Sequence, residues 1–140
     1  ARGAQHVDRP GRAGGRARGE VGHAGGYGPI IEHLNNLKVH HLTMEFTAPQ
    51  AGDMDVFREL RPDFEIGLGC VDVTPGKIDS AETIAARVRK AAEFLAPERI
   101  TLNPDCGFAP GSGAVVSLDE AYRKLCNEAE AARILRAELA

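Results

Sequence analysis

Short apolar segments alternate with segments of helical periodicity from residue 28 to the C-terminus. Three runs predict β-strands, at residues 39–45, 65–72 and 99–103, and a segment of helical pattern follows each of them. The strands are largely apolar, as is typical of parallel strands whose two faces are both covered. The repeated order of strand and helix therefore predicts an α/β fold in which βα units feed a parallel sheet.

The helical segments carry signals for where they begin and which face is apolar. Ser80 predicts the start of a helix that ends before Pro97, and Asp53 predicts the cap of a shorter one. Ser117 and Glu120 have the spacing of a capping box at the start of a final helix. We expect the buried faces to consist of Ile84, Val88, Ala91 and Leu95 in the first helix, and of Leu118, Ala121, Tyr122, Leu125, Ala132, Leu135 and Leu139 in the last.

Three βα units in series suit either a doubly wound sheet or part of a (β/α)8 TIM barrel. A complete barrel takes about 250 residues, whereas this sequence has 140. The barrel interpretation therefore predicts the C-terminal βα units of an incomplete barrel. Its open sheet edges would need a partner chain that completes the barrel.

The first 27 residues differ from the rest in composition. They include five Arg and eight Gly but no Leu, Ile, Met or Phe. Such a segment buries too little apolar surface to offset the entropy lost on ordering. We predict a disordered Arg/Gly-rich tail at residues 1–27 and a folded unit at residues 28–140.

Charge and cysteine content narrow the class of protein. The formal net charge of -3 gives no overall cationic field, so we expect no nucleic-acid partner. No apolar run approaches the roughly 20 residues that a membrane-spanning helix needs, so we expect no membrane partner. The three cysteines cannot all pair within one chain, which favours a reducing compartment, and we expect a cytoplasmic protein.

Polar residues follow each predicted strand, where the functional groups of parallel α/β folds collect. Glu45 ends the first strand, Asp72 ends the second, and Cys106 follows the third within the run Asn-Pro-Asp-Cys-Gly at residues 103–107. Cys106 is predicted to lie in a tight turn, where a presented thiol is either reactive or bound to a metal. Glu45 and Asp72 fit an acid–base or metal site, but solvated carboxylates at strand ends would have the same spacing.

The other two cysteines have simpler interpretations. Cys70 lies within a predicted strand and Cys126 within the final helix. Both are expected to be small buried core residues.

The run at residues 103–107 resembles the last barrel strand of the catalytic domain of cobalamin-independent methionine synthase. Residues 42–45 (Leu-Thr-Met-Glu) resemble that family's strand ending in glutamate. Residues 66–73 resemble its Ile-Gly-x-Gly-x-x-Asp strand, and residues 97–99 (Pro-Glu-Arg) resemble the lead-in to its final strand. These motifs occur in the family's order across residues 28–140.

The resemblance implies a fold, a cofactor and a reaction. It implies that residues 28–140 are the C-terminal portion of a (β/α)8 barrel that binds zinc through a His-x-Cys pair, a glutamate and a later cysteine. It makes Glu45 the glutamate ligand and Cys106 the later cysteine, and Asp72 a candidate for binding the substrate. Zinc would lower the pKa of the homocysteine thiol and present the thiolate to 5-methyltetrahydrofolate or a methyl-corrinoid.

The sequence departs from the family pattern at the His-x-Cys pair. No cysteine precedes Cys70, and the nearest counterpart, His23-Ala24-Gly25, has glycine where cysteine is expected. We hypothesise that residues 1 to about 26 reflect a truncated or frameshifted reading frame. With two of four family ligands, the chain alone is expected to bind zinc weakly and to be inactive as a fragment.

Three alternatives remain open at this point. A zinc thiol alkyltransferase of the epoxyalkane:coenzyme M transferase type would share the barrel and the metal chemistry. A non-catalytic fragment would only associate with a partner chain. A cysteine hydrolase built on Cys106 would need a histidine base, which the sequence does not position.

Overall fold

The computed structural model describes residues 26–108 and 115–139. Its strands are β1 (His41–Glu45), β2 (Glu65–Val71) and β3 (Ile100–Pro104), and its α-helices are α1 (Ile31–Asn35), α2 (Ala81–Ala92) and α3 (Leu118–Leu139). Four 3-10 helices complete the order: η1 (Gly28–Ile30), η2 (Pro49–Ala51), η3 (Met54–Glu59) and η4 (Pro97–Arg99). The three predicted strands are confirmed to within two residues at either end.

Two sequence-based expectations fall largely outside this part of the chain. Residues 1–25, which make up nearly all of the predicted tail, lie outside the described residues, and so does the segment His23-Ala24-Gly25. The disorder predicted for residues 1–27 and the reading-frame hypothesis therefore stay predictions.

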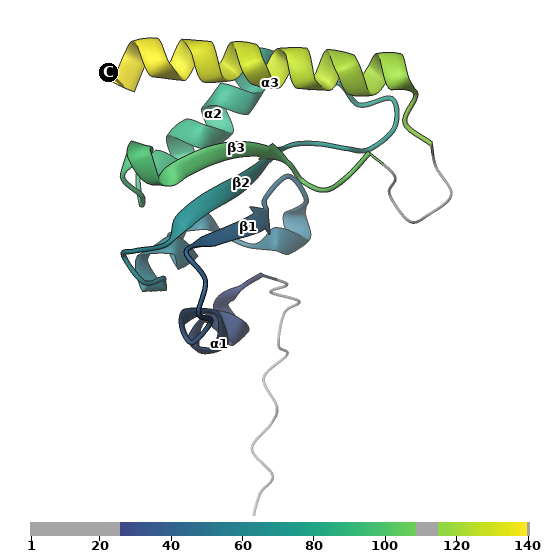
Figure 1. The fold of residues 1–140 in the computed structure, drawn as a ribbon. Helices are drawn as coiled ribbons and strands as arrows, with labels where there is room; N and C mark the ends of the chain where they lie inside the picture. Colours follow the sequence, from purple (N-terminus) through teal and green to yellow (C-terminus); the bar gives the residue numbers. More distant parts are fainter. Residues whose placement is uncertain (1–25, 109–114, 140) are drawn as a thin grey trace, which may run out of the picture.

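The sheet is parallel and its strands follow the order β1-β2-β3. His41 pairs with Glu65 and Glu45 with Gly69 across β1 and β2, and Gly67 pairs with Thr101 across β2 and β3. Figure 1 shows β3, β2 and β1 from top to bottom, with α3 lying across the top and α1 beyond the β1 edge. The α/β fold with parallel βα units is confirmed, and within the described residues the sheet is open at β1 and β3.

The core lies between the sheet and helix α2. Ile66, Leu68 and Cys70 of β2 are fully buried, and the predicted apolar face of α2 is confirmed because Ile84, Val88, Ala91 and Leu95 are all buried. The Ser80 hydroxyl accepts a hydrogen bond from the Thr83 amide at 3.1 Å, as expected for an N-cap. This packing fixes β2 at the centre of the sheet.

The opposite face of the sheet is polar. Gly67 of β2 has no side chain, and the space above it is taken by the ends of His41, Thr43 and Asn103 from the two neighbouring strands. A Cβ on Gly67 would lie 2.6 Å from His41 Nε2 and 2.9 Å from Thr43 Oγ1. Polar side chains from β1 and β3 therefore meet over a glycine track on β2.

The predicted buried face of the last helix is wrong for four of its seven residues, whereas Leu135 is buried as predicted and Ala121 and Ala132 are half-buried. Leu118, Tyr122, Leu125 and Leu139 are 85%, 68%, 43% and 46% exposed. The buried residues of α3 are Leu135 and two that were not predicted, Lys124 and Ala131. The helix is thus rotated partly away from the predicted face, and Lys124 turns inwards, where its ammonium donates to the carbonyls of Asp72 and Thr74 at 3.0 and 2.7 Å.

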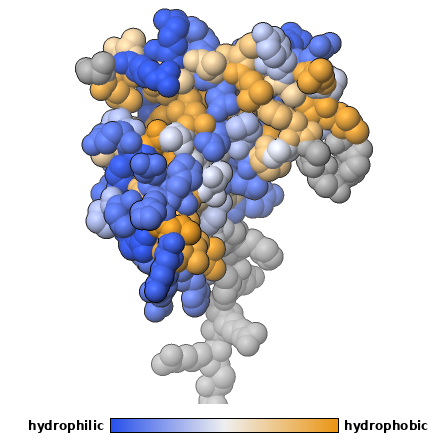
Figure 2. All heavy atoms as spheres, viewed as in Figure 1, coloured by the Kyte–Doolittle hydropathy of each residue, from blue (hydrophilic) through white to orange (hydrophobic). Residues whose placement is uncertain are grey.

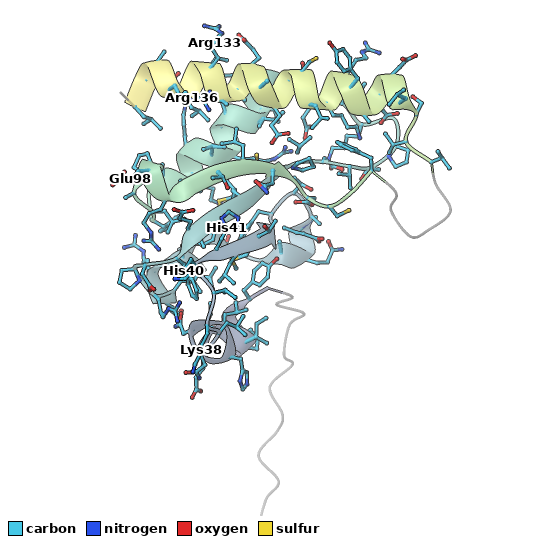
Figure 3. All side chains as sticks on the ribbon, viewed as in Figure 1. Lys38, His40, His41, Glu98, Arg133 and Arg136 are labelled. Atoms are coloured by element: carbon cyan, nitrogen blue, oxygen red, sulfur yellow. The ribbon has the colours of Figure 1, made fainter. Side chains whose placement is uncertain are left out.

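This rotation has two visible consequences. Cys126 is exposed, so its prediction as a core residue is wrong, whereas that of Cys70 is confirmed. Two of the exposed leucines, Leu125 and Leu139, also line an apolar groove between α3 and β3, with Glu98 and Arg136 on its walls. Figure 2 shows apolar side chains at the surface in the upper part of the molecule, where α3 lies, and Figure 3 labels Glu98 and Arg136 there.

The predicted caps of η3 and α3 differ from those in the structure. Asp53 precedes η3 without capping it, because its side chain makes no cap hydrogen bond. Ser117 accepts a hydrogen bond from the Glu120 amide at 3.2 Å, but Glu120 binds Gly76 and Lys124 and makes only half of the capping box. Among the described residues, none of the helices has the length and apolar character needed to cross a membrane.

Candidate functional site

The carboxyl ends of the three strands bring the predicted site residues to one rim of the sheet. Glu45 is the last residue of β1, Asp72 follows β2, and Cys106 lies two residues beyond β3. The Asp105 amide donates to the Val71 carbonyl at 3.0 Å, so the chain after β3 continues beside the end of β2. The parallel register places all three residues at the same end of the sheet.

Glu45 and Cys106 lie within electrostatic reach of each other. Both are exposed, and the Cys106 thiol donates to the Gly107 carbonyl at 3.3 Å. Partial burial raises the pKa of Cys106, and the charges of Glu45 and Asp105 raise it further. Negative charge nearby stabilises the thiol form, so this shift is opposite to the lowered pKa of an activated cysteine nucleophile.

Asp105 is a site residue that sequence analysis treated only as part of a motif. One oxygen, Oδ1, accepts hydrogen bonds from the backbone amides of Phe46 at 3.0 Å and Thr47 at 3.3 Å. The other, Oδ2, accepts one from the Thr47 hydroxyl. The available signal was a carboxylate directly before Cys106, but its partners 58 and 59 residues away could not be found from sequence.

Tyr27 is a second residue that sequence analysis missed, because it was assigned to the predicted tail. Its hydroxyl accepts a hydrogen bond from the Glu45 amide at 2.8 Å, and its ring lies 5.5 Å from that of Phe46. Burial raises the pKa of the Tyr27 hydroxyl, with a smaller contribution from the charge of Glu45. The sequence signal that could have indicated Tyr27 was its position as a single aromatic residue in a glycine-rich segment.

Asp72 lies beside the rim and is largely buried, at 7% exposure. Its Oδ1 accepts from the Thr74 amide at 2.8 Å and its Oδ2 from the Lys77 ammonium at 2.5 Å. Burial acts to raise the pKa of Asp72, but the hydrogen bonds from Lys77 and Thr74 outweigh it and lower that pKa to about 2. Asp72 is therefore ionised at neutral pH, and its contact with a substrate stays a prediction.

The donor types at the rim fit part of a zinc site. A glutamate oxygen and a cysteine sulfur are both ligands that zinc takes, and catalytic zinc normally has three protein ligands. Across residues 26–108 and 115–139, no group of three or more His, Cys, Asp or Glu side chains has an arrangement that could hold a metal ion. Glu45 and Cys106 are thus two donors of a set that the described residues leave incomplete.

The histidines of β1 do not complete this set. His41 begins the strand and Glu45 ends it, and His40 lies just before the strand (Figure 3). Four residues of extended chain span about 13 Å. His41 instead lies 3.8 Å from Glu65 at the other end of the sheet.

Comparisons with known proteins show the family of the chain. A family model described as the catalytic domain of cobalamin-independent synthase matches residues 25–133. Methionine synthases of Saccharolobus islandicus and Pyrococcus horikoshii are 31% identical over 115 residues and 33% identical over 110 residues. These matches cover 82% and 79% of this chain, but only 33% and 31% of the relatives, so the chain spans about a third of their length.

A solved structure supports the fold. The chain superposes with a TM-score of 0.71 on a B12-independent methionine synthase from a Shewanella species, at 24% identity over 81% of this chain and 31% of that one. The expected fold class, βα units from part of a (β/α)8 barrel, is thereby confirmed. From its family match and its curated relatives, the chain belongs to the cobalamin-independent methionine synthase catalytic-domain family.

Proposed function

We propose that residues 28–140 are the C-terminal portion of a catalytic barrel that transfers a methyl group to the thiol of homocysteine and so forms methionine. The methyl donor would be 5-methyltetrahydrofolate or a methyl-corrinoid. The observation that carries the proposal is the position of Glu45 and Cys106 at the same rim of the sheet, in a chain of this family. The whole enzyme's activity would also require the part of the barrel that these residues do not form.

The proposed roles follow from the chemistry of the side chains. Glu45 would supply an oxygen ligand and Cys106 a sulfur ligand to zinc, and the remaining ligands would come from elsewhere in the protein or from water. Zinc, when bound, supplies a Lewis acid that lowers the pKa of a substrate thiol. Asp72, ionised beside this rim, is proposed to contact the homocysteine ammonium group.

The raised pKa of Cys106 adds a pH dependence to metal binding. A cysteine ligand must lose its proton when it binds a metal, so the metal competes with that proton. With the thiol pKa held above its usual value by burial, Glu45 and Asp105, affinity should rise with pH throughout the neutral range. If all of the metal's ligands were already deprotonated at neutral pH, the metal affinity would not rise with pH.

Cobalt binding tests the proposed ligands directly. Co²⁺ replaces zinc in thiolate sites and gives a thiolate-to-metal charge-transfer absorption in the near ultraviolet. We expect this band in the parent protein and its loss in Cys106→Ala. Metal affinity should fall by more than about 100-fold, because removing a group that only hydrogen-bonds to a ligand already lowers affinity by up to about 100-fold. Cys126→Ala removes another exposed thiol and should leave the band intact. A band that survives Cys106→Ala, or that never forms in the parent even when the rest of the barrel is supplied, would refute the proposed ligand role.

Substrate choice separates the alternatives. A zinc thiol alkyltransferase of the epoxyalkane:coenzyme M transferase type would use the same two ligands but would act on coenzyme M. Mass-spectrometric detection of methionine from homocysteine and a methyl donor, with the protein completed by the rest of the barrel, would support methyl transfer. Alkylation of coenzyme M alone would favour the second reaction.

A non-catalytic chain that associates with a partner is the remaining candidate. The open edges of the sheet and the apolar groove between α3 and β3 favour association. In that case the protein would bind neither zinc nor cobalt through Cys106, and the cobalt titration would reveal it.

A further inference from the structure

Asp105 connects the ends of two strands that are not neighbours in the sheet. It follows β3, and its carboxylate reaches over β2 to the residues that follow β1. Three donors converge on it: the amides of Phe46 and Thr47 and the hydroxyl of Thr47. Hydrogen bonds to a carboxylate are stronger than those between neutral groups, so this is a firm connection across the sheet.

The residues that Asp105 joins stand next to the two proposed ligands. Phe46 directly follows Glu45, and Asp105 directly precedes Cys106. Its own amide is also held, at 3.0 Å from the Val71 carbonyl at the end of β2. The carboxylate and the backbone of one residue therefore fix the ends of all three strands relative to one another.

Gly69 makes this crossing possible. A Cβ at position 69 would lie 2.6 Å from Asp105 Oδ1, 2.8 Å from the Met44 carbonyl oxygen and 2.9 Å from Glu45 Cα. Real Cβ atoms do not approach so closely, so the side chain of Asp105 occupies space that any other residue at position 69 would take. The sequence shows this glycine, but only the structure shows what it makes room for.

We propose that Asp105 is a positioning residue: by spanning Gly69 it sets the separation of Glu45 and Cys106 and so sets the affinity of their site for metal. This inference rests on the proposed function, because it requires that Glu45 and Cys106 bind the same metal ion. Asp105 is assigned no bond to the metal, since both of its oxygens already accept hydrogen bonds from the chain after β1. Partners that orient a metal's ligands typically change metal affinity by about 10- to 100-fold when removed.

The test measures zinc affinity, by competition with a chromophoric chelator, in four variants. Asp105→Ala removes all three hydrogen bonds and should lower the affinity by about 10- to 100-fold. Asp105→Asn keeps the shape and an oxygen acceptor for the amides, so it should retain most of the affinity. Thr47→Val removes only the hydroxyl donor and should fall between the parent and Asp105→Ala. Asp119→Asn, an exposed carboxylate on α3, is the matched control and should equal the parent.

Amide hydrogen exchange by NMR on the metal-free protein supplies a second readout. In Asp105→Ala the amides of Phe46 and Thr47 should exchange faster than in the parent, while those of α2 keep their protection and report that the variant is folded. Unchanged exchange at Phe46 and Thr47 would overturn the connection itself. Faster exchange with parental zinc affinity would overturn the positioning role, and equal losses in Asp105→Asn and Asp105→Ala would show a charge or ligand role instead.

Failure of the proposed function looks different from failure of this inference. If the parent binds zinc no more tightly than Cys106→Ala does, Cys106 is not a zinc ligand. The proposed function and the positioning role are then both refuted. If the parent binds zinc through Cys106 and Asp105→Ala binds it equally well, only the positioning role is refuted.

Discussion

At the scale of single residues, the best-defined electrostatic feature is the cluster that follows β2. Asp72 is ionised and held by Thr74 and Lys77, while the buried Lys124 donates to the backbone of the same loop and lies 3.0 Å from Glu120. A buried ammonium is stable only when its donors are satisfied, and here three acceptors surround it. The cluster joins the loop after β2 to α3.

The lowered pKa of Asp72 predicts how stability depends on pH. Its pKa falls from an ordinary 3.8 to about 2 on folding, so the folded state favours the ionised form. The resulting stabilisation is present above pH 4 and is lost as the pH falls from about 4 towards 2. Asp72→Asn should lower the free energy of unfolding at pH 7 by about 1 kcal/mol, a discounted value because Lys77 is half exposed.

Urea unfolding at several pH values checks this prediction. The difference between the parent and Asp72→Asn should shrink below pH 4. Asp53→Asn is the control, because Asp53 is 85% exposed and only 3.9 Å from Lys90, and it should change stability little at any pH. A difference that stays constant down to pH 2 would contradict the proposed linkage.

Residue types and spacing could identify Glu45, Asp72 and Cys106 as rim residues, because each ends or follows a strand. They could not identify Asp105 as the connection between β1 and β3, because its hydrogen-bond partners are distant in sequence. Tyr27 was equally hidden, since its contact with Glu45 depends on the path of the chain before α1. Pairwise contacts across a sheet are set by topology, which local patterns do not encode.

At the scale of elements, α2 and α3 show why one helix could be predicted in detail and the other could not. The capping residue and the apolar face of α2 follow ordinary rules, and both are confirmed. In α3 the apolar stripe predicted the burial of Leu135 correctly but also predicted four residues that are exposed. It missed Lys124, whose buried ammonium has three acceptors, because binary patterning assigns a lysine to the exposed face.

Two leucines of α3 test the observed rotation. Leu135 is 4% exposed and Leu125 is 43% exposed. Leu135→Ala should lower the free energy of unfolding by about 2–4 kcal/mol, because it leaves a cavity against α2. Leu125→Ala should cost less than about 1 kcal/mol, because its side chain is already partly in water.

Chemical denaturation of the two variants and the parent gives the comparison, with the same substitution made at two positions of one helix. If Leu125→Ala proved as destabilising as Leu135→Ala, Leu125 would be as buried as Leu135, contrary to the structure.

At the scale of the whole molecule, the described residues form one segment of a barrel wall. One face of the sheet is covered by helices, and the other carries His41, Thr43 and Asn103 around a glycine track. The strand pattern predicted the parallel βα units correctly but left a doubly wound sheet open, and the resemblance to the family gave the barrel segment. The polar character of the inner face was not predicted, since it depends on which residues face each other across three strands.

An open sheet predicts an uneven distribution of local stability. β2 pairs on both sides and is buried along Ile66–Val71, whereas β1 and β3 each have one neighbouring strand among the described residues. We expect the amides of β2 to exchange at least about tenfold more slowly than those of β1 and β3, because opening β2 requires breaking the core. Hydrogen exchange followed by mass spectrometry measures this, and equal protection in all three strands would contradict it.

The missing side chain at Gly69 also bears on how this position tolerates genetic change. Every missense change produced by one base substitution in a glycine codon introduces a Cβ. At Gly69 that atom would lie within 3.0 Å of Asp105, of the Met44 backbone and of Glu45 at once. Gly76 has open space where its Cβ would be, although its positive φ of 78° disfavours most replacements, and Gly107 has open space too. In a population of random point mutants selected for a folded protein, replacements at codon 69 should therefore be depleted more strongly than those at codon 107.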